Sequence, residues 1–567
     1  MLSWFDQNPD RYWWFVCLVV AGSLFVLLRP LLRPDWKDSK GTDWRWGLVI
    51  FLVLIAGRWP TWFVTRELGS DESQLVAGAM TLRHDPVFWR SINGGTAGPL
   101  DFYALFPVGW IHGADDYFSA RVTALCLIAA ALILAHQIIA VVYGRLVARC
   151  TGFATLCFES LTLHYDLLHY STELVPVCLL AAAFFMATRR FTANTGWLWN
   201  ALGGLLLGSV AFAKIQALPL AGLLTLGWIA GEFLMQEGRS GDRRNRFLAL
   251  GVGLCAPLLV CALFLTVTGQ WRTAVVSYVL RNAAYVNADP KDISFVLLMF
   301  WRSSSVDQGL LVSWLAGGGL WVLLTLPLSR DSTRPLRIVV FAAVVFFLAS
   351  FVCIVVPRRP FFHYWQLLVV PWSLVLGATT GLMMVALENQ RSRFRCGVLC
   401  AALICSTAGL LYERAGCQHP YVGRLALYHS NPQGAVAKEL MKYARPGESL
   451  GTWGWMSNFF VEAGLRQATR NAITGTEIPD NPFRDYYRDL YLTDLQRSAP
   501  PVFVDAVGPG NFCYEDRRLA HDAIFPELAA YIRTYYTQVA DLHGSRIYVR
   551  NDRLAACRTS SSALLSD

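Results

Sequence analysis

Long apolar stretches recur along the first 412 residues of the chain, with short polar segments between them. Most of these stretches are long enough to cross the hydrocarbon core of a membrane, which is about 30 Å thick. The pattern predicts a polytopic α-helical membrane protein with about twelve transmembrane helices. The predicted spans are residues 12–30, 46–64, 118–144, 151–163, 173–189, 196–212, 216–234, 247–268, 307–328, 338–356, 364–386 and 397–412.

The composition supports this class of protein. Hydrophobic residues make up 54% of the 567 residues and charged residues only 16%, whereas soluble domains carry about 25% charge. The net charge of +9 does not indicate nucleic-acid binding, because the arginines and lysines gather in alternate loops. The positive-inside rule predicts that these loops are cytoplasmic, and they comprise residues 29–45, 145–149, 189–190, 239–246, 330–337 and 391–395.

The other set of loops is then predicted to lie outside the membrane. It comprises residues 65–117, 164–172, 269–306 and 357–363, together with everything after about residue 412. Short amphipathic pieces such as DESQLVAGAMTLRH in the first of these loops are expected to lie along the membrane surface. The first apolar run is predicted to be a retained helix, because no basic region precedes it and no small-residue cleavage site follows it.

After residue 412 the chain becomes more polar and alternates strand-like with helix-like stretches. ESLGTWGW, PPVFVDAV and SRIYVRN are predicted strands, and GAVAKELMKYARPG and AHDAIFPELAAYIRTYY are predicted helices. We therefore expect a transmembrane domain over residues 1–412 and a small extracytoplasmic α/β domain over residues 413–567. The spacing of Cys417, Cys513 and Cys557 does not show which of them, if any, form a disulfide.

Two adjacent carboxylates, Asp71 and Glu72 in GSDESQ, follow the second predicted span by a few residues. In an external loop, one carboxylate could accept a proton from an attacking hydroxyl while the other orients it or binds a cation. Acidic residues are also common in solvated loops. The pair alone therefore does not decide between a solvated loop and a catalytic site.

The next external loop, LHYDLLHYSTELVP, combines acids with histidines. Asp166, His169 and Glu173 are candidates for an acceptor or metal site. Glu173 has a structural explanation as well, because a carboxylate at the start of a helix is favourable and Ser171 or Thr172 can cap that helix. Capping leaves Asp166 and His169 unexplained.

Cations stand at the outer ends of later spans, against the charge bias. Lys214 interrupts the apolar run GSVAFAKIQALPL, where it either snorkels to the interface or pairs with an anion such as a lipid phosphate. Arg358 and Arg359 in RRPFFHYWQLLVVP could clamp a phosphate, with His363 and Tyr364 as further donors. The structural alternative is an aromatic belt with snorkelling arginines.

These two kinds of residue fit one reaction. Acids can deprotonate an acceptor hydroxyl, and cations can hold a phosphate leaving group. A phosphate that departs from an anomeric carbon accumulates negative charge, which fixed cations stabilise in the transition state. The candidate residues therefore favour glycosyl transfer from a lipid phosphate.

The order of the motifs resembles the GT-C superfamily of membrane glycosyltransferases. The likeness is greatest to the group of dolichyl-phosphate-mannose protein mannosyltransferases and aminoarabinose transferases. It rests on GSDESQ, GTAGPLDFYAL, GSVAFAKIQALPL and RRPFFHYWQLLVVP, and covers roughly residues 46–412. The chain departs from the family pattern by its additional helix at residues 12–30 and by the lack of a glycine directly after the lysine.

The resemblance implies an inverting transfer of a hexosyl or pentosyl group from a polyprenyl-phosphate donor to an acceptor hydroxyl. It makes Asp71 the catalytic base, with Glu72 in support. It assigns the donor phosphate to Lys214, Arg358 and His363, with Tyr364 nearby. Some relatives hold a divalent cation near the acidic loop and others need none, so metal dependence stays open, with Asp166 or Glu173 as additional ligands.

The expected partners are the lipid-linked sugar donor, a glycan, lipid or protein acceptor, and the membrane lipids, in a bacterial inner membrane with the site and the tail outside. Two other functions compete with this one. The first is a lipid or sugar transporter or flippase, although such proteins place ionisable residues at mid-membrane. The second is a non-enzymatic envelope assembly protein that binds through its tail. Trp453 and Trp455 of that tail could stack on a sugar or be buried for structural reasons.

Overall fold

The computed structural model describes residues 2–29, 39–193, 195–234, 240–287, 334–359, 361–386 and 434–556, with short pieces between 292 and 422. The chain forms two compact units, each assembled from segments that are far apart in the sequence. The first unit contains Met1–Trp62, Arg121–Phe264 and Tyr285–Ala426. The second contains Phe63–Ala120, Leu265–Ala284 and Leu427–Asp567. The domain boundary expected near residue 412 stays a prediction.

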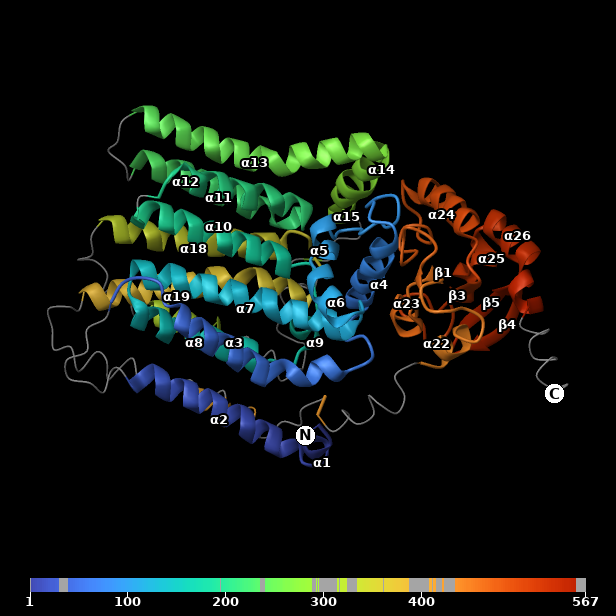
Figure 1. Ribbon diagram of the computed structural model, residues 1–567, viewed down its shortest axis with the longest axis horizontal. Helices are drawn as coiled ribbons and strands as arrows, with labels where there is room; N and C mark the ends of the chain where they lie inside the picture. The colour runs from blue at the N-terminus through green and yellow to red at the C-terminus, as the bar shows by residue number, and fades with distance from the viewer. Residues whose placement is uncertain are drawn as a thin grey trace. The chain divides into compact units, whose positions relative to one another are not determined.

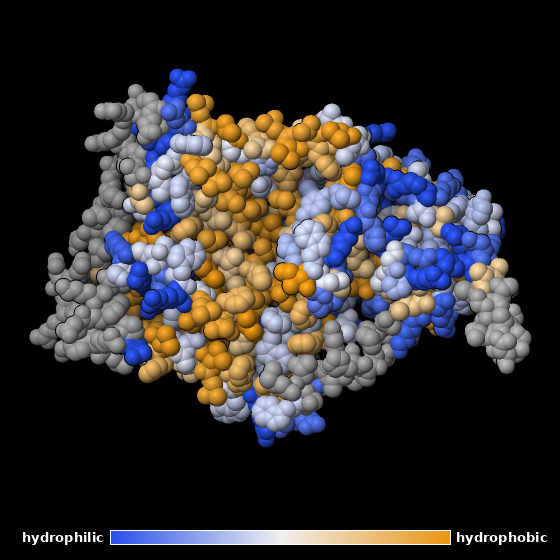
Figure 2. All heavy atoms as spheres, in the orientation of Figure 1, coloured by the Kyte–Doolittle hydropathy of each residue, from blue (hydrophilic) through white to orange (hydrophobic). Residues whose placement is uncertain are grey.

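Long helices that run side by side build the first unit (Figure 1). Among the residues that the structure describes, seven segments are long and apolar enough to cross a membrane, so the protein is an integral membrane protein with several spans. These segments are Pro9–Leu28, Trp44–Phe63, Tyr117–Val142, Leu174–Ala193, Ile215–Phe233, Arg243–Thr268 and Phe362–Met384. Two shorter apolar helices, Trp197–Phe212 and Val339–Val355, accompany them. Figure 2 shows hydrophobic side chains gathered over these long helices.

The helices that lie wholly or partly in the first unit occur in the order α1 (Leu2–Gln7), α2 (Pro9–Leu28), α3 (Trp44–Arg58), η2 (Trp59–Phe63), α7 (Tyr117–Val142), α8 (Arg145–Leu161), α9 (Tyr165–Leu168), α10 (Leu174–Ala193), α11 (Trp197–Ser209), η3 (Val210–Phe212), η4 (Ile215–Ala217), α12 (Leu218–Leu234), α13 (Ser240–Thr268), α15 (Arg281–Asn287), α18 (Arg334–Val355), η7 (Phe362–Trp365) and α19 (Gln366–Ala386). Helices lie at ten of the twelve predicted spans. The predicted spans 307–328 and 397–412 lie largely outside the described residues, so twelve spans are not shown.

Helix α8 differs from the expectation for residues 151–163. It begins at Arg145 and carries Arg149 and Glu159, and most of its residues are buried. Arg149 donates to the carboxylate of Asp43 at 2.7 Å, ahead of α3. The helix therefore lies in the interior of the unit and keeps polar side chains there by pairing them.

A second buried polar network joins four helices at the arginine-rich end of the unit. Glu232 of α12 accepts hydrogen bonds from Arg246 of α13 at 2.9 Å and from Asn200 of α11 at 3.2 Å. Arg190 of α10 lies 3.1 Å from the same carboxylate. Buried charges are tolerated only when they are matched, so this network specifies which ends of α10, α12 and α13 meet.

A mixed five-stranded sheet forms the core of the second unit. Its strands are β1 (Ser449–Gly454), β2 (Arg466–Gln467), β3 (Val502–Ala506), β4 (Tyr536–Leu542) and β5 (Ser545–Arg550). Their order is β2-β1-β3-β5-β4. Strand β1 is parallel to β2 and β3, whereas β5 is antiparallel to β3 and β4. The three strands predicted from the sequence are all present, and β2 and β4 are additional.

The second unit also contains two sets of helices, one from the C-terminal part of the chain and one from earlier loop segments. The C-terminal ones are α22 (Ala435–Leu440), α23 (Asn458–Ala463), α24 (Arg484–Ser498), η8 (Arg517–Leu519), α25 (His521–Ile524) and α26 (Pro526–Tyr535). The loop segments add α4 (Ser70–His84), α5 (Pro99–Tyr103), α6 (Phe106–His112), α14 (Trp271–Ala274) and the π-helix η5 (Val275–Leu280). The predicted helix over residues 520–536 is divided, because Pro526 cannot continue α25 and begins α26 instead.

Helix α4 belongs to the core of the second unit. Its Ala77 is buried in one hydrophobic cluster with Val436, Leu450 and Phe459, and the backbone N–H of Gln467 donates to Thr81 at 3.0 Å. The expectation that residues 71–84 lie along the membrane surface is therefore wrong. The apolar positions of this segment pack against the C-terminal sheet.

Candidate functional site

Lys214 lies where the chain breaks between η3 and η4, at the junction of α11 and α12. It has extended backbone angles, φ −149° and ψ 120°, and Pro219 stands at the start of α12, where proline is tolerated because the first turn needs no N–H donor. The Lys214 side chain is buried. The sequence therefore ends one helix, begins the next, and places a cation at the junction.

The ammonium group of Lys214 already has an anionic partner in the protein. Its Nζ donates to the buried carboxylate of Glu173 and lies 2.5 Å from the hydroxyl of Thr172. The ring of Tyr364 lies 4.8 Å from the same nitrogen. Lys214 therefore pairs with an anion in the structure, and that anion is the carboxylate of Glu173.

Asp166 of α9 meets two imidazoles. One oxygen of its carboxylate lies 3.3 Å from Nε2 of His169 and 3.8 Å from Nδ1 of His363. His363 also reaches Glu173, with Nε2 4.0 Å from that carboxylate. Burial opposes ionisation of Asp166, but the hydrogen bonds and charges of the two imidazoles outweigh it and hold its pKa well below the usual value.

These contacts join four separate segments. We call Asp166, His169, Glu173, Lys214, His363 and Tyr364 the lysine cluster. Every member is a residue that the sequence singles out, and the structure brings them together from α9, from the residue before α10, from the break before η4 and from η7. Opposite charges that pair in this way offset part of the cost of their burial and hold one another in place.

The segment that carries Asp166 is held by a buried ion pair that the sequence analysis missed. Arg58 at the end of α3 pairs with Glu159 of α8, and its Nη1 donates to the carbonyl of Leu167 at 3.0 Å. The amide of Gln366 donates to the same carbonyl at 3.4 Å. An arginine inside the apolar run IAGRWP is the signal that could have revealed this pair.

The two predicted arginines, Arg358 and Arg359, lie close in the sequence to His363 of the lysine cluster. Arg359 places its guanidinium 4.8 Å from the ring centre of Tyr285, a cation–π contact. Arg358 has a positive φ of 52°, which is uncommon for a residue with a side chain. Both precede His363 in the same connecting segment between α18 and η7.

In the second unit, Asp71 and Glu72 lie in the first turn of α4. The sequence suggested a loop, whereas the structure places them where the helix dipole favours negative charge. Glu72 is buried and accepts a hydrogen bond from the N–H of Leu68 at 3.1 Å. Asp71 is partly exposed. Asp71 is thus the member of the pair that an external molecule can reach.

Glu67 is a further acid at this place that the sequence analysis missed. Its carboxylate accepts a hydrogen bond from Ser73, whose hydroxyl lies 2.8 Å from that of Tyr117. Burial, together with the charges of Glu72, Glu462 and Asp71, raises its pKa to about 7. We call Glu67, Asp71, Glu72 and Glu462 the acidic cluster. Glu462 comes from α23, so no local sequence pattern could have placed it there.

The C-terminal part of the second unit borders Asp71. The hydroxyl of Ser457 donates to the carbonyl of Ser70 at 3.2 Å, and burial and then the charge of Asp71 raise the pKa of the Cys513 thiol. Beside these residues the rings of Trp455 and Phe512 meet edge to face with centres 5.7 Å apart. Phe512 is exposed and Trp455 is half-buried.

The two tryptophans of GTWGW therefore have different roles. Trp453 is completely buried in the sheet, and its indole N–H donates to the carbonyl of Leu519 at 3.1 Å. It is a structural residue. Trp455 is half-buried, and its ring meets that of the exposed Phe512. Cys513 is a free thiol, while Cys417 and Cys557 lie outside the described residues.

Within the described part of the chain, two groups of side chains have a spacing that could hold a metal ion. Asp166, His169 and His363 present ligand atoms within 4.8 Å of one another, and this oxygen and nitrogen set suits Zn²⁺. Asp505, His521 and Asp522 form the second group. There Arg546 donates to both carboxylates, so an arginine already supplies the positive charge.

No protein-family model matches the sequence, and no curated protein is significantly similar to it. Among solved structures, the apo crystal structure of ArnT from Cupriavidus metallidurans, a GT-C aminoarabinose transferase, is similar over 90% of this chain and 98% of its own. The TM-score is 0.51 and the sequence identity 14%. The chain has the GT-C fold.

Two further structures, both from Archaeoglobus fulgidus, are less similar to this chain than ArnT is. The apo oligosaccharyltransferase has a TM-score of 0.38 and 12% identity, over 81% of this chain and 69% of its own. The oligosaccharyltransferase AglB in complex with an inhibitory peptide and a dolichol-phosphate has a TM-score of 0.37 and 12% identity, over 89% and 70%. The fold assignment therefore rests on ArnT.

Proposed function

We propose that this protein is an inverting glycosyltransferase, which moves a monosaccharide from a polyprenyl-phosphate donor to an acceptor hydroxyl at the outer face of the membrane. The lysine cluster carries the proposal. Buried charges at the ends of membrane spans are costly, and proteins keep them chiefly for function. The GT-C fold makes lipid-linked sugar transfer the function that such a cluster fits best.

The lysine cluster offers donors for the phosphate of the lipid. An ammonium group has three N–H donors, and Glu173 and Thr172 accept from two of them. The remaining donor of Lys214 can bind a phosphate oxygen, and His363 can donate a second hydrogen bond. Arg358 and Arg359 are proposed to complete the phosphate site from the same segment as His363. Tyr364 lies under the ammonium group and orients it.

The proposed reaction is a single displacement. The carboxylate of Asp71 takes the proton of the acceptor hydroxyl, and the acceptor oxygen attacks the anomeric carbon from the side opposite the phosphate. The bond between that carbon and the phosphate oxygen breaks, and its electron pair leaves with the polyprenyl phosphate. The new glycosidic bond has inverted configuration. The cations of the phosphate site stabilise the charge that develops on the leaving group.

The remaining acids support these steps. Glu72 is proposed to support Asp71 by position, because its hydrogen bond from the N–H of Leu68 holds the first turn of α4. Asp166 and His169 are proposed to orient His363, with a divalent cation as an alternative occupant of the same three side chains. The half-exposed pair Trp455 and Phe512 is proposed to receive the acceptor beside Asp71.

Purified protein in lipid, incubated with a panel of polyprenyl-phosphate sugars, tests the proposal. The wild type and the control Asp485→Asn, at an exposed position of α24, should release polyprenyl phosphate. Asp71→Asn should not release it. A transporter or an assembly protein would release none with any donor, even with membrane extract as acceptor. Equal release by Asp71→Asn would exclude Asp71 as the base and make Asp166 the next candidate.

A further inference from the structure

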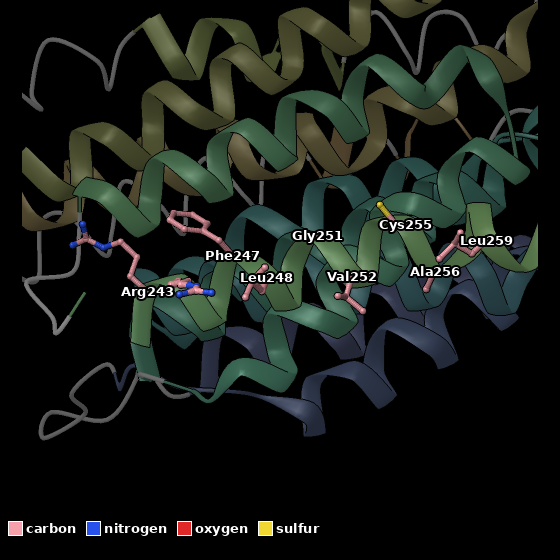
Figure 3. Close-up of a pocket in the computed structure, with 9 residues that line it drawn as sticks. Arg243, Phe247, Leu248, Gly251, Val252, Cys255, Ala256 and Leu259 are labelled. Atoms are coloured by element: carbon pink, nitrogen blue, oxygen red, sulfur yellow. The ribbon is translucent and has the colours of Figure 1, made fainter. Parts of the chain in front are cut away.

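An elongated hollow follows the surface of α13. It has a volume of about 770 Å³, and Arg243 lies at one end of it (Figure 3). Arg244, the next residue of the helix, also lines it. Pockets of about 300–1,000 Å³ hold small molecules in proteins. This hollow is lined almost entirely by apolar side chains, so its chemistry differs from that of both clusters described above.

The spacing of residues along α13 explains its shape. The lining residues form two adjacent rows in which every fourth residue points the same way, and such rows are ridges on a helix surface. One row is Arg243, Phe247, Gly251, Cys255 and Leu259, and the other is Arg244, Leu248, Val252 and Ala256. Small residues in the middle of the rows leave the space between larger ones. A side chain built on Gly251 would meet nothing within 4 Å.

One end of the hollow is cationic. Arg243 and Arg244 lie in the first turns of α13, where the helix dipole adds positive potential. Arg246, one turn further, is matched by Glu232, and the guanidinium of Arg243 lies 5.6 Å from the ring of Phe233. An anion at this end would therefore meet two guanidiniums and a helix N-terminus together.

The other end is apolar and faces the lipid. Leu248, Val252 and Leu259 are exposed, and the sixteen helical steps from Arg243 to Leu259 span about 24 Å. That length covers the headgroup region and about half of a 30 Å hydrocarbon core. The hollow thus has the polarity and the length of one lipid molecule in one leaflet.

The hollow and the lysine cluster lie at opposite ends of the same helices. Arg246 beside the hollow binds Glu232 near the end of α12, and Lys214 lies eighteen residues earlier, which corresponds to about 27 Å of helix. The two sites therefore serve different leaflets. The arginine-rich end is the one that the charge bias predicts to be cytoplasmic.

We infer that the hollow on α13 is a binding site for an anionic glycerophospholipid, whose phosphate lies between Arg243 and Arg244 and whose acyl chain lies over Gly251 and Ala256. Clusters of basic residues at the cytoplasmic ends of membrane helices recognise anionic headgroups. The site is independent of the proposed glycosyl transfer, because it contains no residue of either cluster.

Native mass spectrometry of the detergent-purified protein, titrated with phosphatidylglycerol or with phosphatidylcholine, tests this inference. The wild type should bind one phosphatidylglycerol more tightly than all others. Each arginine near a charged headgroup is worth about 1 kcal/mol, so Arg243→Gln with Arg244→Gln should weaken that binding roughly 30-fold. Gly251→Leu should abolish it by filling the hollow, without any change in charge.

Arg189→Gln on α10 is the matched control, because it removes an arginine from the same end of the helices outside the hollow. It should bind as the wild type does. Equal affinity of the wild type and Gly251→Leu would overturn the inference, and so would equal affinity for phosphatidylcholine. Gly251→Leu should fold normally, since its side chain enters open space, and an unchanged melting temperature would verify this.

Discussion

Replacement of Lys214 separates its structural from its catalytic role. Lys214→Met leaves the buried carboxylate of Glu173 without its cation. Removal of one partner from a buried ion pair costs about 3–5 kcal/mol, because the other charge stays buried. Replacement of both partners by neutral side chains of similar size is often nearly neutral. Lys214→Met with Glu173→Gln should therefore recover most of the stability that the single variant loses.

Activity should not recover in the same way. Loss of one fixed group that stabilises a developing anion lowers turnover by about 10²–10³-fold. The double variant has no ammonium group for the leaving phosphate, so it should be as slow as Lys214→Met although it is more stable. Thr172 and Tyr364, the other contacts of Lys214, are unchanged in both variants.

The assay combines thermal melting of the detergent-purified variants with release of polyprenyl phosphate at a temperature where all are folded. Glu173→Gln completes the double-mutant cycle. If the double variant regained both stability and turnover, Lys214 would serve only to neutralise Glu173. If Lys214→Met melted as the wild type does, the ion pair would contribute nothing to stability, and the reasoning from burial would be refuted.

Three further predictions concern other residues. The pKa of Glu67 is about 7 in the folded protein against an ordinary 4.5, so the free energy of unfolding should fall by up to about 3 kcal/mol as the pH rises from 4.5 to 7 and then level off. Glu67→Gln should remove the matching fall in melting temperature. If the melting temperature of this variant depended on pH as that of the wild type does, the assignment to Glu67 would be contradicted. Trp455→Ala should raise the acceptor KM about tenfold with little effect on the melting temperature. Trp453→Ala should instead lower the melting temperature, because a buried indole is lost. An unchanged acceptor KM in Trp455→Ala, with a raised KM in Trp453→Ala, would exclude Trp455 from acceptor binding. Arg58→Met should destabilise the fold, because Glu159 stays buried without its cation, and should reduce turnover by freeing the segment that carries Asp166. Addition of Glu159→Gln should restore stability but only part of the turnover. Unchanged turnover in Arg58→Met would show that the segment does not need this support.

Local sequence patterns determined the helices and much of the sheet. A membrane span needs only a sufficient length of apolar residues, and a helix satisfies its own backbone hydrogen bonds, so α2, α7 and α10 could be predicted without knowledge of their neighbours. Strands β1, β3 and β5 could also be predicted from local sequence, because each is a short apolar run that ends at glycine, proline or polar residues. Lys214 and Asp166 stood out because charge is rare beside apolar spans.

Pairing between distant segments was decided only by the tertiary structure. Lys214 and its partner Glu173 are 41 residues apart, and no local pattern distinguishes a carboxylate of the protein from a lipid phosphate as the anion. Glu67 has an ordinary acidic sequence context, and its raised pKa arises from burial and from Glu462 of α23. Helix α4 has apolar positions suited to a membrane surface or to a protein core, and the C-terminal sheet supplies the core. Burial and charge pairing depend on which surfaces meet, and that information is spread over the whole chain.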